Sequence, residues 1–320
     1  MVFLRRKSGY FVLAESHRME GRVSQKTVAY LGKAERAIAR LSDLNLPDAE
    51  KEEIANQLRP FLKTGAAIDT PLLKWAGGKR RMVDSIRPFW MMSKATRLVE
   101  PFCGALSIAL GLAPKKALLN DVNFHLINLY WHIQDGLKIT LELDPKRFYE
   151  YRDRFNNQAN PASVESAQLF YYLLRSAHSG LCRFNSNGKF NVPRQKGELV
   201  YPSVVPYTSV FQGWQFACGD FEELKIRKHD FVYADPPYDS LDGKDSFTSY
   251  FGTFGWQDQE RLADWLSRLP CPVLASNHDT ERIRSLYEAH GFSVAPINSH
   301  RGINSTGDRA KAEELLFWKS

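Results

Sequence analysis

The chain has 320 residues, 43% of them hydrophobic and 12% aromatic, so it is long enough to bury more than one core. Its formal net charge of +7 favours an anionic partner. No apolar run approaches the roughly 18 residues of a membrane-spanning helix, and the charged start is not typical of a secretory signal peptide, so we expect an intracellular protein.

Residues 1–65 are predicted to form a small basic α+β unit. Residues 9–16 and 24–32 are typical of the two strands of a hairpin, and residues 34–44 are typical of a helix. Basic residues outnumber acidic residues in this unit. The small and polar residues 63–71 then indicate a linker.

Beyond the linker, strand-like and helical segments alternate. The expected helices include residues 258–269 and 281–291. The expected strands are residues 96–102, 116–123, 230–238, 271–277, 291–297 and 314–319. This alternation predicts an α/β fold with a mainly parallel sheet that is covered by helices.

The alternation breaks between residues 135 and 213. Residues 144–157 and 163–178 are predicted to be amphipathic helices, and residues 181–193 a hairpin with an Asn-Gly turn. No acidic residue occurs from Ser176 to Gly197, whereas four basic residues do: Arg183, Lys189, Arg194 and Lys196. Such a basic strip is typical of a surface that meets phosphates.

Two Gly-containing turns are candidates for a cofactor site. In LVEPFCGAL (98–106) a strand ends in an acid and a tight turn, and Asp121 ends the next strand, where a carboxylate could accept ribose hydroxyls. In LLKWAGGKRRM (72–82) the spacing is not that of a P-loop, but Trp75 and the neighbouring lysines suit a carboxylate or phosphate. Alternatively, residues 72–82 are only a turn that leads into a helix and bind no ligand.

The segment FVYADPPYDS (231–240) is a candidate for chemistry on a base. Two prolines cannot donate to a sheet, so the strand must end where Asp235 begins a stiff loop. Asp235 and the Pro236 carbonyl could accept the hydrogens of an exocyclic amine, and Tyr238 could stack on the ring. The alternative is a proline-rich turn with an exposed acid.

Four of these segments occur in the order that is known from one family: KWAGGK, EPFCGA, NDVN and DPPY. Over residues 70–318 the chain resembles the Dam-type (D12 class) DNA adenine-N6 methyltransferases. Residues 179–193 look like the DNA-reading hairpin of that family, and residues 276–280 and 307–316 look like its late segments.

The resemblance implies a Rossmann-like, mostly parallel methyltransferase sheet with an inserted helical target-recognition domain. The catalytic domain would comprise residues 70–135 and 214–320, and the target-recognition domain residues 136–213. Residues 1–65 lie outside the resemblance. They could bind DNA without sequence preference, bind a partner protein or serve as a structural appendage.

The resemblance also implies the cofactor, the substrate and the site residues. S-adenosylmethionine would be held by Trp75, Lys79, Glu100, Phe102, Gly104, Asp121 and Asp235. The catalytic residues Asp235, Pro236 and Tyr238 would hold an adenine flipped out of double-stranded DNA, without a metal. The residues that would contact the DNA, and read GATC, are Lys74, His178, Leu181, Arg183, Lys189 and Pro193.

Two residues depart from the family pattern. Leu106 stands where the family usually has a glycine, and if the position needs a positive φ, its Cβ costs about 1–2 kcal/mol. His178 stands where the family often has an aromatic that enters the DNA stack.

Two alternatives to a DNA methyltransferase remain. A catalytically silent DNA-binding protein would result if Leu106 has disabled the cofactor site. A methyltransferase for RNA or protein could use a similar loop, although the basic hairpin favours duplex DNA. The resemblance implies a cytoplasmic protein that is encoded by a bacterium, phage or plasmid. It leaves open whether the protein is paired with a restriction nuclease.

The four cysteines, Cys103, Cys182, Cys218 and Cys271, are scattered without a C-x-x-C pair. We therefore predict neither a disulfide framework nor a zinc site.

Overall fold

The computed structural model describes residues 2–7, 10–19, 22–32, scattered positions between 37 and 58, and residues 70–197, 199–239, 254–299 and 312–319. The chain divides into two compact units, Met1–Ala67 and Ile68–Ser320. We describe each unit by itself.

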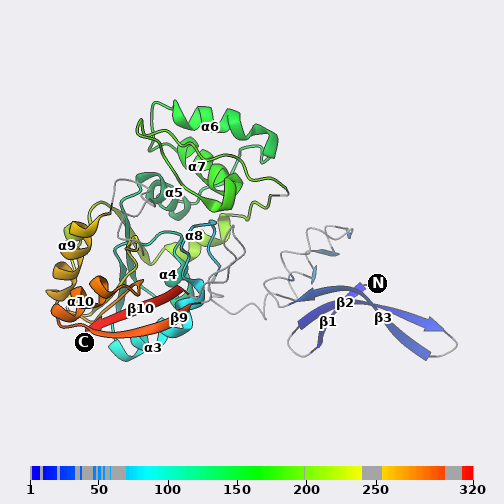
Figure 1. The fold of residues 1–320 in the computed structure, drawn as a ribbon. Coiled ribbons are helices and arrows are strands. Elements are labelled where there is room, and N and C mark those ends of the chain that lie inside the picture. Colours follow the sequence, from blue (N-terminus) through cyan, green and yellow to red (C-terminus); the bar gives the residue numbers. More distant parts are fainter. Residues whose placement is uncertain are drawn as a thin grey trace. The chain divides into compact units, whose positions relative to one another are not determined.

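The first unit contains an antiparallel sheet in the order β1-β2-β3. Its strands are β1 (Val2–Lys7), β2 (Tyr10–Met19) and β3 (Arg22–Gly32) (Figure 1). Among the described residues of this unit, its core contains Phe11, Leu13, Leu31, Ala37, Ile54 and Leu58. The predicted hairpin was incomplete, since β1 was missed; consecutive charges at Arg5–Lys7 hide the alternation of a strand. Of the helix expected at 34–44, only Ala37 lies within the described residues.

The second unit contains a seven-stranded sheet in the order β6-β5-β4-β7-β8-β10-β9. Its strands are β4 (Arg97–Glu100), β5 (Ala117–Asp121), β6 (Trp214–Cys218), β7 (Asp230–Ala234), β8 (Val273–His278), β9 (Ser293–Ser299) and β10 (Ala312–Lys319). Strands β6, β5, β4, β7 and β8 are parallel, whereas β10 is antiparallel to both of its neighbours.

The mainly parallel sheet of an α/β fold is thereby confirmed, and all six expected strands are present. Strand β6 was missed. It is short, and only its first residue, Trp214, is buried, so its sequence carries a weak strand signal. It lies at the edge of the sheet, where it pairs only with β5.

Successive residues of the central strands contribute to two different cores. Leu98, Tyr233 and Leu274 pack in the larger core, whereas the adjacent Val99 and Ala275 pack in the smaller one. Because side chains alternate across a strand, the sheet is covered on both faces. Figure 1 shows α9 and α10 together on one side of the second unit.

The α-helices of the second unit are α3 (Val83–Ser93), α4 (Ser107–Leu112), α5 (Phe124–Gln134), α6 (Phe148–Asn156), α7 (Val164–Ser176), α8 (Val205–Phe211), α9 (Trp256–Ser267) and α10 (Glu281–Ala289). Side chains cap the first turns of three of them. Asn123, Ser163 and Thr280 accept a backbone hydrogen bond at the start of α5, α7 and α10. No helix in the described part of the chain is both long and apolar enough to span a membrane.

Residues 135–213, where the α/β alternation breaks, contain the two predicted helices and the predicted hairpin. Helices α6 and α7 lie beside each other above α5 in Figure 1. Phe184 pairs with Phe190 in the hairpin, and the turn between them contains Gly188. Phe190 is buried and Phe184 stacks on His125 of α5, so these aromatic rings anchor the hairpin to the protein.

Candidate functional site

Three predicted site segments meet at one edge of the sheet. Glu100 ends β4, Asp121 ends β5, and Asp235 directly follows β7. These strands are neighbours and run parallel, in the order β5-β4-β7. Their carboxyl ends therefore form a common edge, which is where open α/β sheets bind ligands.

The turn after β4 brings three of the predicted cofactor residues together. Gly104 has a φ of +45°, which favours glycine, and an added Cβ would lie 3.0 Å from Trp75 Nε1. Its N–H donates to Asp121 Oδ2 at 3.1 Å, and its carbonyl accepts from the Tyr130 hydroxyl at 2.7 Å. Trp75 and Asp121 thus both contact the turn around Gly104.

The Asp121 carboxylate accepts a second backbone hydrogen bond, from Asn123 N at 3.0 Å. Burial raises the pKa of Asp121 to about 6, although the two backbone hydrogen bonds oppose the shift. This carboxyl group therefore titrates only slightly below neutral pH.

Glu100 is buried, with 3% of its surface exposed, and its Oε1 atom has no hydrogen-bond partner within the described residues. Burial raises the pKa of Glu100 well above its usual value, and the nearby Asp235 raises it further. A buried acceptor without a partner is unfavourable, so a donor on a bound ligand would stabilise it.

Asp235 lies between a cation and a buried hydroxyl group. Lys79 Nζ is 3.4 Å from Asp235 Oδ1, and Ser276 Oγ donates to the same oxygen at 2.8 Å. The Tyr233 hydroxyl lies 2.9 Å from Ser276 Oγ, which can accept because its own hydrogen is directed to Asp235. Burial raises the pKa of Asp235, although Lys79 and the hydroxyl groups oppose the rise.

The Tyr238 ring also contacts the cation. Lys79 Nζ lies 4.2 Å from the ring centroid, and the His278 ring packs edge-on at 4.8 Å. The Tyr238 hydroxyl donates to Glu314 Oε2 at 3.4 Å. Pro236 is buried, and its carbonyl has no donor within the described residues.

Side chains that the sequence did not single out hold this loop. Gln259 Nε2 donates to the Pro237 carbonyl at 2.8 Å, and Asn277 Nδ2 donates to Gln259 Oε1 at 3.0 Å. The buried Asp239 carboxylate accepts two hydrogen bonds from the Arg282 guanidinium. Ser276 and Asn277 lie in the SNHDT segment, the one signal that could have indicated such roles.

Leu106 occupies the left-handed conformation, with a φ of 63°, at the start of α4. The positive φ that a glycine would favour is therefore present. The side chain is 1% exposed and packs in the larger core. Leu106 is thus both a strained residue and a packing residue.

Phe102 packs away from the other predicted cofactor residues. Its ring contacts those of Phe221 and Phe254, with centroid distances of 5.7 and 5.6 Å, and belongs to the margin of the smaller core. Trp75, by contrast, packs against the larger core, and the cofactor role of Phe102 remains a prediction.

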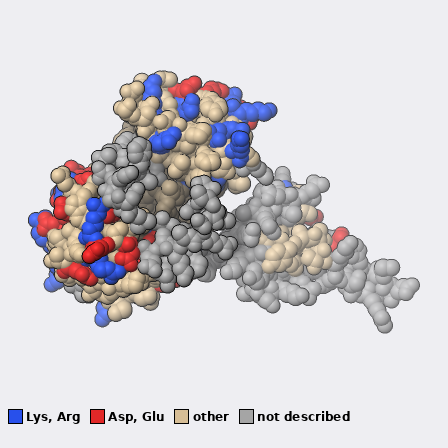
Figure 2. Space-filling model, viewed as in Figure 1, with Lys and Arg blue, Asp and Glu red and all other residues tan. Residues whose placement is uncertain are grey.

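Five of the six predicted DNA-contacting residues are exposed: His178, Leu181, Arg183, Lys189 and Pro193. Arg183 Nε donates to Asn191 Oδ1 at 2.8 Å, and Lys189 Nζ donates to Asn157 Oδ1 at 3.3 Å. In Figure 2 several basic side chains lie over the part of the molecule that contains α6 and α7.

Lys74 is the sixth predicted DNA-contacting residue, and it is half-buried. It connects the turn at residues 72–82 to the region of the hairpin. Its Nζ donates to Gln195 Oε1 at 3.2 Å. Burial, and secondarily Arg175, lower the pKa of Lys74. Gly180 has a φ of +67°, and an added Cβ would lie 2.5 Å from Lys74 Cβ. Only glycine fits at this close approach of two distant segments.

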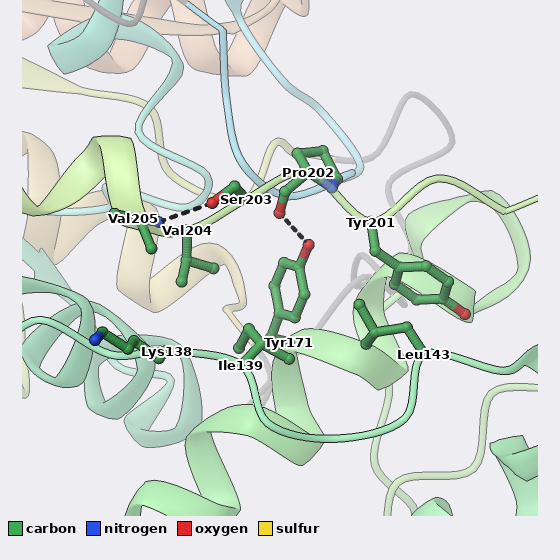
Figure 3. A pocket seen from close by; sticks show the side chains of 9 residues that line it. All are labelled: Lys138, Ile139, Leu143, Tyr171, Tyr201, Pro202, Ser203, Val204 and Val205. Carbon is green, nitrogen blue, oxygen red and sulfur yellow. Dashed lines mark hydrogen bonds between the residues drawn. The ribbon is translucent and has the colours of Figure 1, made fainter. Parts of the chain in front are cut away.

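A cavity of about 260 Å³ lies elsewhere in the second unit, and Figure 3 shows the residues around it. It is lined by Lys138, Ile139, Leu143, Tyr171, Tyr201, Pro202, Ser203, Val204 and Val205. The Tyr171 hydroxyl donates to the Pro202 carbonyl at 2.5 Å across one side of it. None of the predicted site residues lines this cavity.

All four cysteines are free, and three of them are buried. Within the described ranges, no group of three or more His, Cys, Asp or Glu side chains could hold a metal ion.

Comparison with known proteins identifies the family. Residues 75–303 match the family "D12 class N6 adenine-specific DNA methyltransferase". The DNA N-6-adenine-methyltransferase of Escherichia phage P1 is 31% identical over 80% of this chain, but this chain covers only 36% of that protein. The DNA adenine methylase of Escherichia coli K12 is 34% identical over 76% of this chain and 93% of its own length.

The solved structures that match this chain are more distant from it. A precorrin-6y C5,15-methyltransferase from Geobacter metallireducens has a TM-score of 0.35 and 7% identity, over 75% of this chain and 88% of its own. At this distance the likeness bears on neither fold nor substrate. The family match and the identity to the curated relatives are sufficient by themselves: the chain belongs to the D12 class of N6 adenine-specific DNA methyltransferases.

Proposed function

We propose that the chain transfers a methyl group from S-adenosylmethionine to N6 of an adenine flipped out of duplex DNA, in the sequence GATC. The observation that carries this proposal is the loop after β7. There a carboxylate, a carbonyl without a donor in the described residues and an aromatic ring follow the strand that pairs in parallel with β4, the strand before the Gly104 turn. We place the enzyme in the cytoplasm of a bacterial host.

The residues at the sheet edge fit the cofactor, which supplies the methyl group on a sulfonium when it is bound. Asp121 offers acceptors for the ribose hydroxyls, and Trp75 over Gly104 offers a surface for the adenine ring. Glu100, buried and lacking a donor for Oε1 within the described ranges, suits the ammonium of the methionine part.

The loop after β7 suits the target base. The Asp235 carboxylate and the Pro236 carbonyl would each accept one N6 hydrogen, which makes the nitrogen lone pair available. The Tyr238 ring would support the base. Because the Lys79 ammonium already lies over that ring, the adenine must take the other face or displace the ammonium.

The activity can be tested with purified protein, tritiated S-adenosylmethionine and plasmid DNA from a host that does not methylate GATC. We expect tritium in the DNA, and resistance to a nuclease that cuts only unmethylated GATC. Label without resistance would point to another sequence. DNA binding without label would identify a silent DNA-binding protein. Label in RNA but not in DNA, in a parallel reaction with RNA as the substrate, would identify an RNA methyltransferase.

We further propose that residues 136–213 form the target-recognition domain and that Arg183 reads a guanine. Arg183 is exposed on the hairpin, and an arginine can donate two hydrogen bonds to O6 and N7 of guanine. The nearby Leu181 and Pro193, also exposed, would pack on the thymine methyl group, and Lys74 would contact the first guanine. His178 would enter the stack left by the flipped base.

Replacement of Arg183 by alanine is expected to relax recognition of one base pair. The lost contacts should reduce discrimination there by about 1–3 kcal/mol. Lys189→Ala, the matched control, removes a charge from the same hairpin and should weaken binding to all sequences alike. Sequencing of N6-methyladenine in a random library would show a degenerate last position for Arg183→Ala; an unchanged GATC would contradict the assigned role.

Binding of S-adenosylmethionine is expected to weaken as the pH falls through about 6, the pKa of Asp121. Below that pKa the carboxyl group is protonated and loses acceptors for the ribose hydroxyls. Calorimetry between pH 8 and pH 5 would measure the change in Kd. Asp121→Asn should bind weakly at every pH and lack this transition; the same transition in Asp121→Asn would assign it to another group.

A further inference from the structure

The side chain of Lys74, which is proposed to contact the first guanine, is held at both of its ends. Its Nζ donates to Gln195 Oε1 at 3.2 Å. At its other end, an added Cβ on Gly180 would lie 2.5 Å from Lys74 Cβ and 3.0 Å from the Lys74 carbonyl oxygen. Lys74 and Gln195 are both half-buried. These contacts restrict a long side chain that is flexible when it is free.

The backbone of Gln195 is bound to the end of α7. Its N–H donates at 2.8 Å to the carbonyl of Ser176, the last residue of that helix. The preceding Arg194 pairs with Ala177 in an antiparallel bridge. Ser176 is fully buried. Gln195 therefore projects its amide from a backbone that is hydrogen-bonded to the protein interior, and not from the exposed turn of the hairpin.

A glutamine amide orients an ammonium group without neutralising it. The ammonium has three N–H donors, and Gln195 Oε1 accepts from one of them. The other two can donate to O6 and N7 of a guanine. Adenine presents an N6 donor where guanine presents the O6 acceptor, so an ammonium in a fixed place rejects adenine. An ammonium that can swing away tolerates adenine.

We propose that Gln195 is a positioning residue for base recognition: by holding the Lys74 ammonium, it sets the preference for guanine at the first position of the methylated sequence. This inference rests on the proposed function, and in particular on the contact between Lys74 and the first guanine. Gln195 acts through Lys74 and needs no contact with DNA of its own. Its effect is confined to the first position, whereas that of Arg183 is confined to the last.

The test uses Gln195→Met, which keeps the length of the side chain but lacks the amide oxygen. The wild type and the variant methylate a random-sequence duplex library, and strand-specific sequencing of N6-methyladenine identifies the bases around each methylated adenine. We expect GATC for the wild type. For the variant we expect the preference for guanine at the first position to fall about tenfold, with the last position unchanged.

The variant Lys74→Ala shows whether Gln195 acts through the ammonium. If it does, adding Gln195→Met to Lys74→Ala should not change the first-position preference any further. The matched control is Gln212→Met, which removes a side-chain hydrogen bond to the Gln134 carbonyl and should methylate GATC like the wild type. A further loss in the double variant, or a loss of preference at every position in Gln195→Met, would indicate a structural defect and overturn the proposal.

A measurement without DNA tests the hydrogen bond itself. Loss of the acceptor should lower the pKa of Lys74, so that its amine reacts about threefold faster with an amine-specific reagent. Mass spectrometry would measure the labelling of Lys74 against that of the exposed Lys115. Unchanged labelling of Lys74 in Gln195→Met would show that the amide does not hold the ammonium, and would overturn the proposal.

A second variant covers the case in which Gln195→Met fails to fold. Gln195→Ala keeps the backbone hydrogen bond to Ser176 and should show the same relaxed first position. Methylation confined to GATC in the wild type and in the folded variants would overturn this inference alone. A wild type that methylates no adenine, or only in a sequence without the first guanine, would overturn the proposed function and this inference with it.

Discussion

Replacement of Asp235 by asparagine is expected to reduce the methyl-transfer rate by about 10²- to 10³-fold. The side chain keeps its volume, and its oxygen can still accept from Ser276 Oγ. It loses the negative charge that pairs with Lys79 and that would accept an N6 hydrogen. Single-turnover transfer of tritiated methyl groups to a GATC duplex would measure the loss.

DNA binding should survive the same substitution, because the predicted phosphate contacts lie on the hairpin at residues 179–193 and not on the β7 loop. The matched control is Asp220→Asn, which removes a carboxylate from an exposed ion pair with Arg261. That variant should transfer methyl groups like the wild type. If the methyl-transfer rate of Asp235→Asn lies within about threefold of the wild-type rate, the proposed role of Asp235 is wrong.

Replacement of Leu106 by glycine is expected to destabilise the protein by about 2 kcal/mol, although it removes backbone strain. A left-handed residue with a Cβ costs about 1–2 kcal/mol, and glycine would recover that amount. Loss of a buried leucine side chain costs about 3–5 kcal/mol when the cavity does not collapse. Leu106 is 1% exposed, so the packing loss should exceed the relief of strain.

Leu106→Ala separates the two effects, since alanine loses nearly the same packing but keeps the strained Cβ. The glycine variant should therefore be more stable than the alanine variant by about 1 kcal/mol, the reverse of the order in a helix interior. Urea unfolding of both variants would measure the difference. Equal stability of the two would show that the φ of 63° at Leu106 carries no strain.

The affinity for S-adenosylmethionine should change little in Leu106→Gly, because the side chain packs in the larger core. The departure from the family glycine would then affect stability more than cofactor binding. A large loss of affinity, measured by calorimetry, would show that the Leu106 side chain sets the geometry of the Gly104 turn.

The sequence by itself determined the α/β class, the order of the motifs and the hairpin. Each of these depends on local chemistry. Prolines 236 and 237 must end a strand, Gly104 permits a tight turn, and Gly188 permits the left-handed turn of the hairpin. Continuous apolar runs mark the central strands of the large sheet. Strand β1, with its run of charges, and the short edge strand β6 lack this signal and were missed.

Only the tertiary structure decided which side chains support the site. Ser276 donates to Asp235 across 41 positions of sequence, and Gly180 approaches Lys74 across an even longer separation. The packing of Phe102 against the smaller core likewise depends on elements that meet only after folding. The same holds for the burial of Leu106 in the larger core. Local preferences carry no information about such contacts, because the partners are set by the order and packing of the strands and helices.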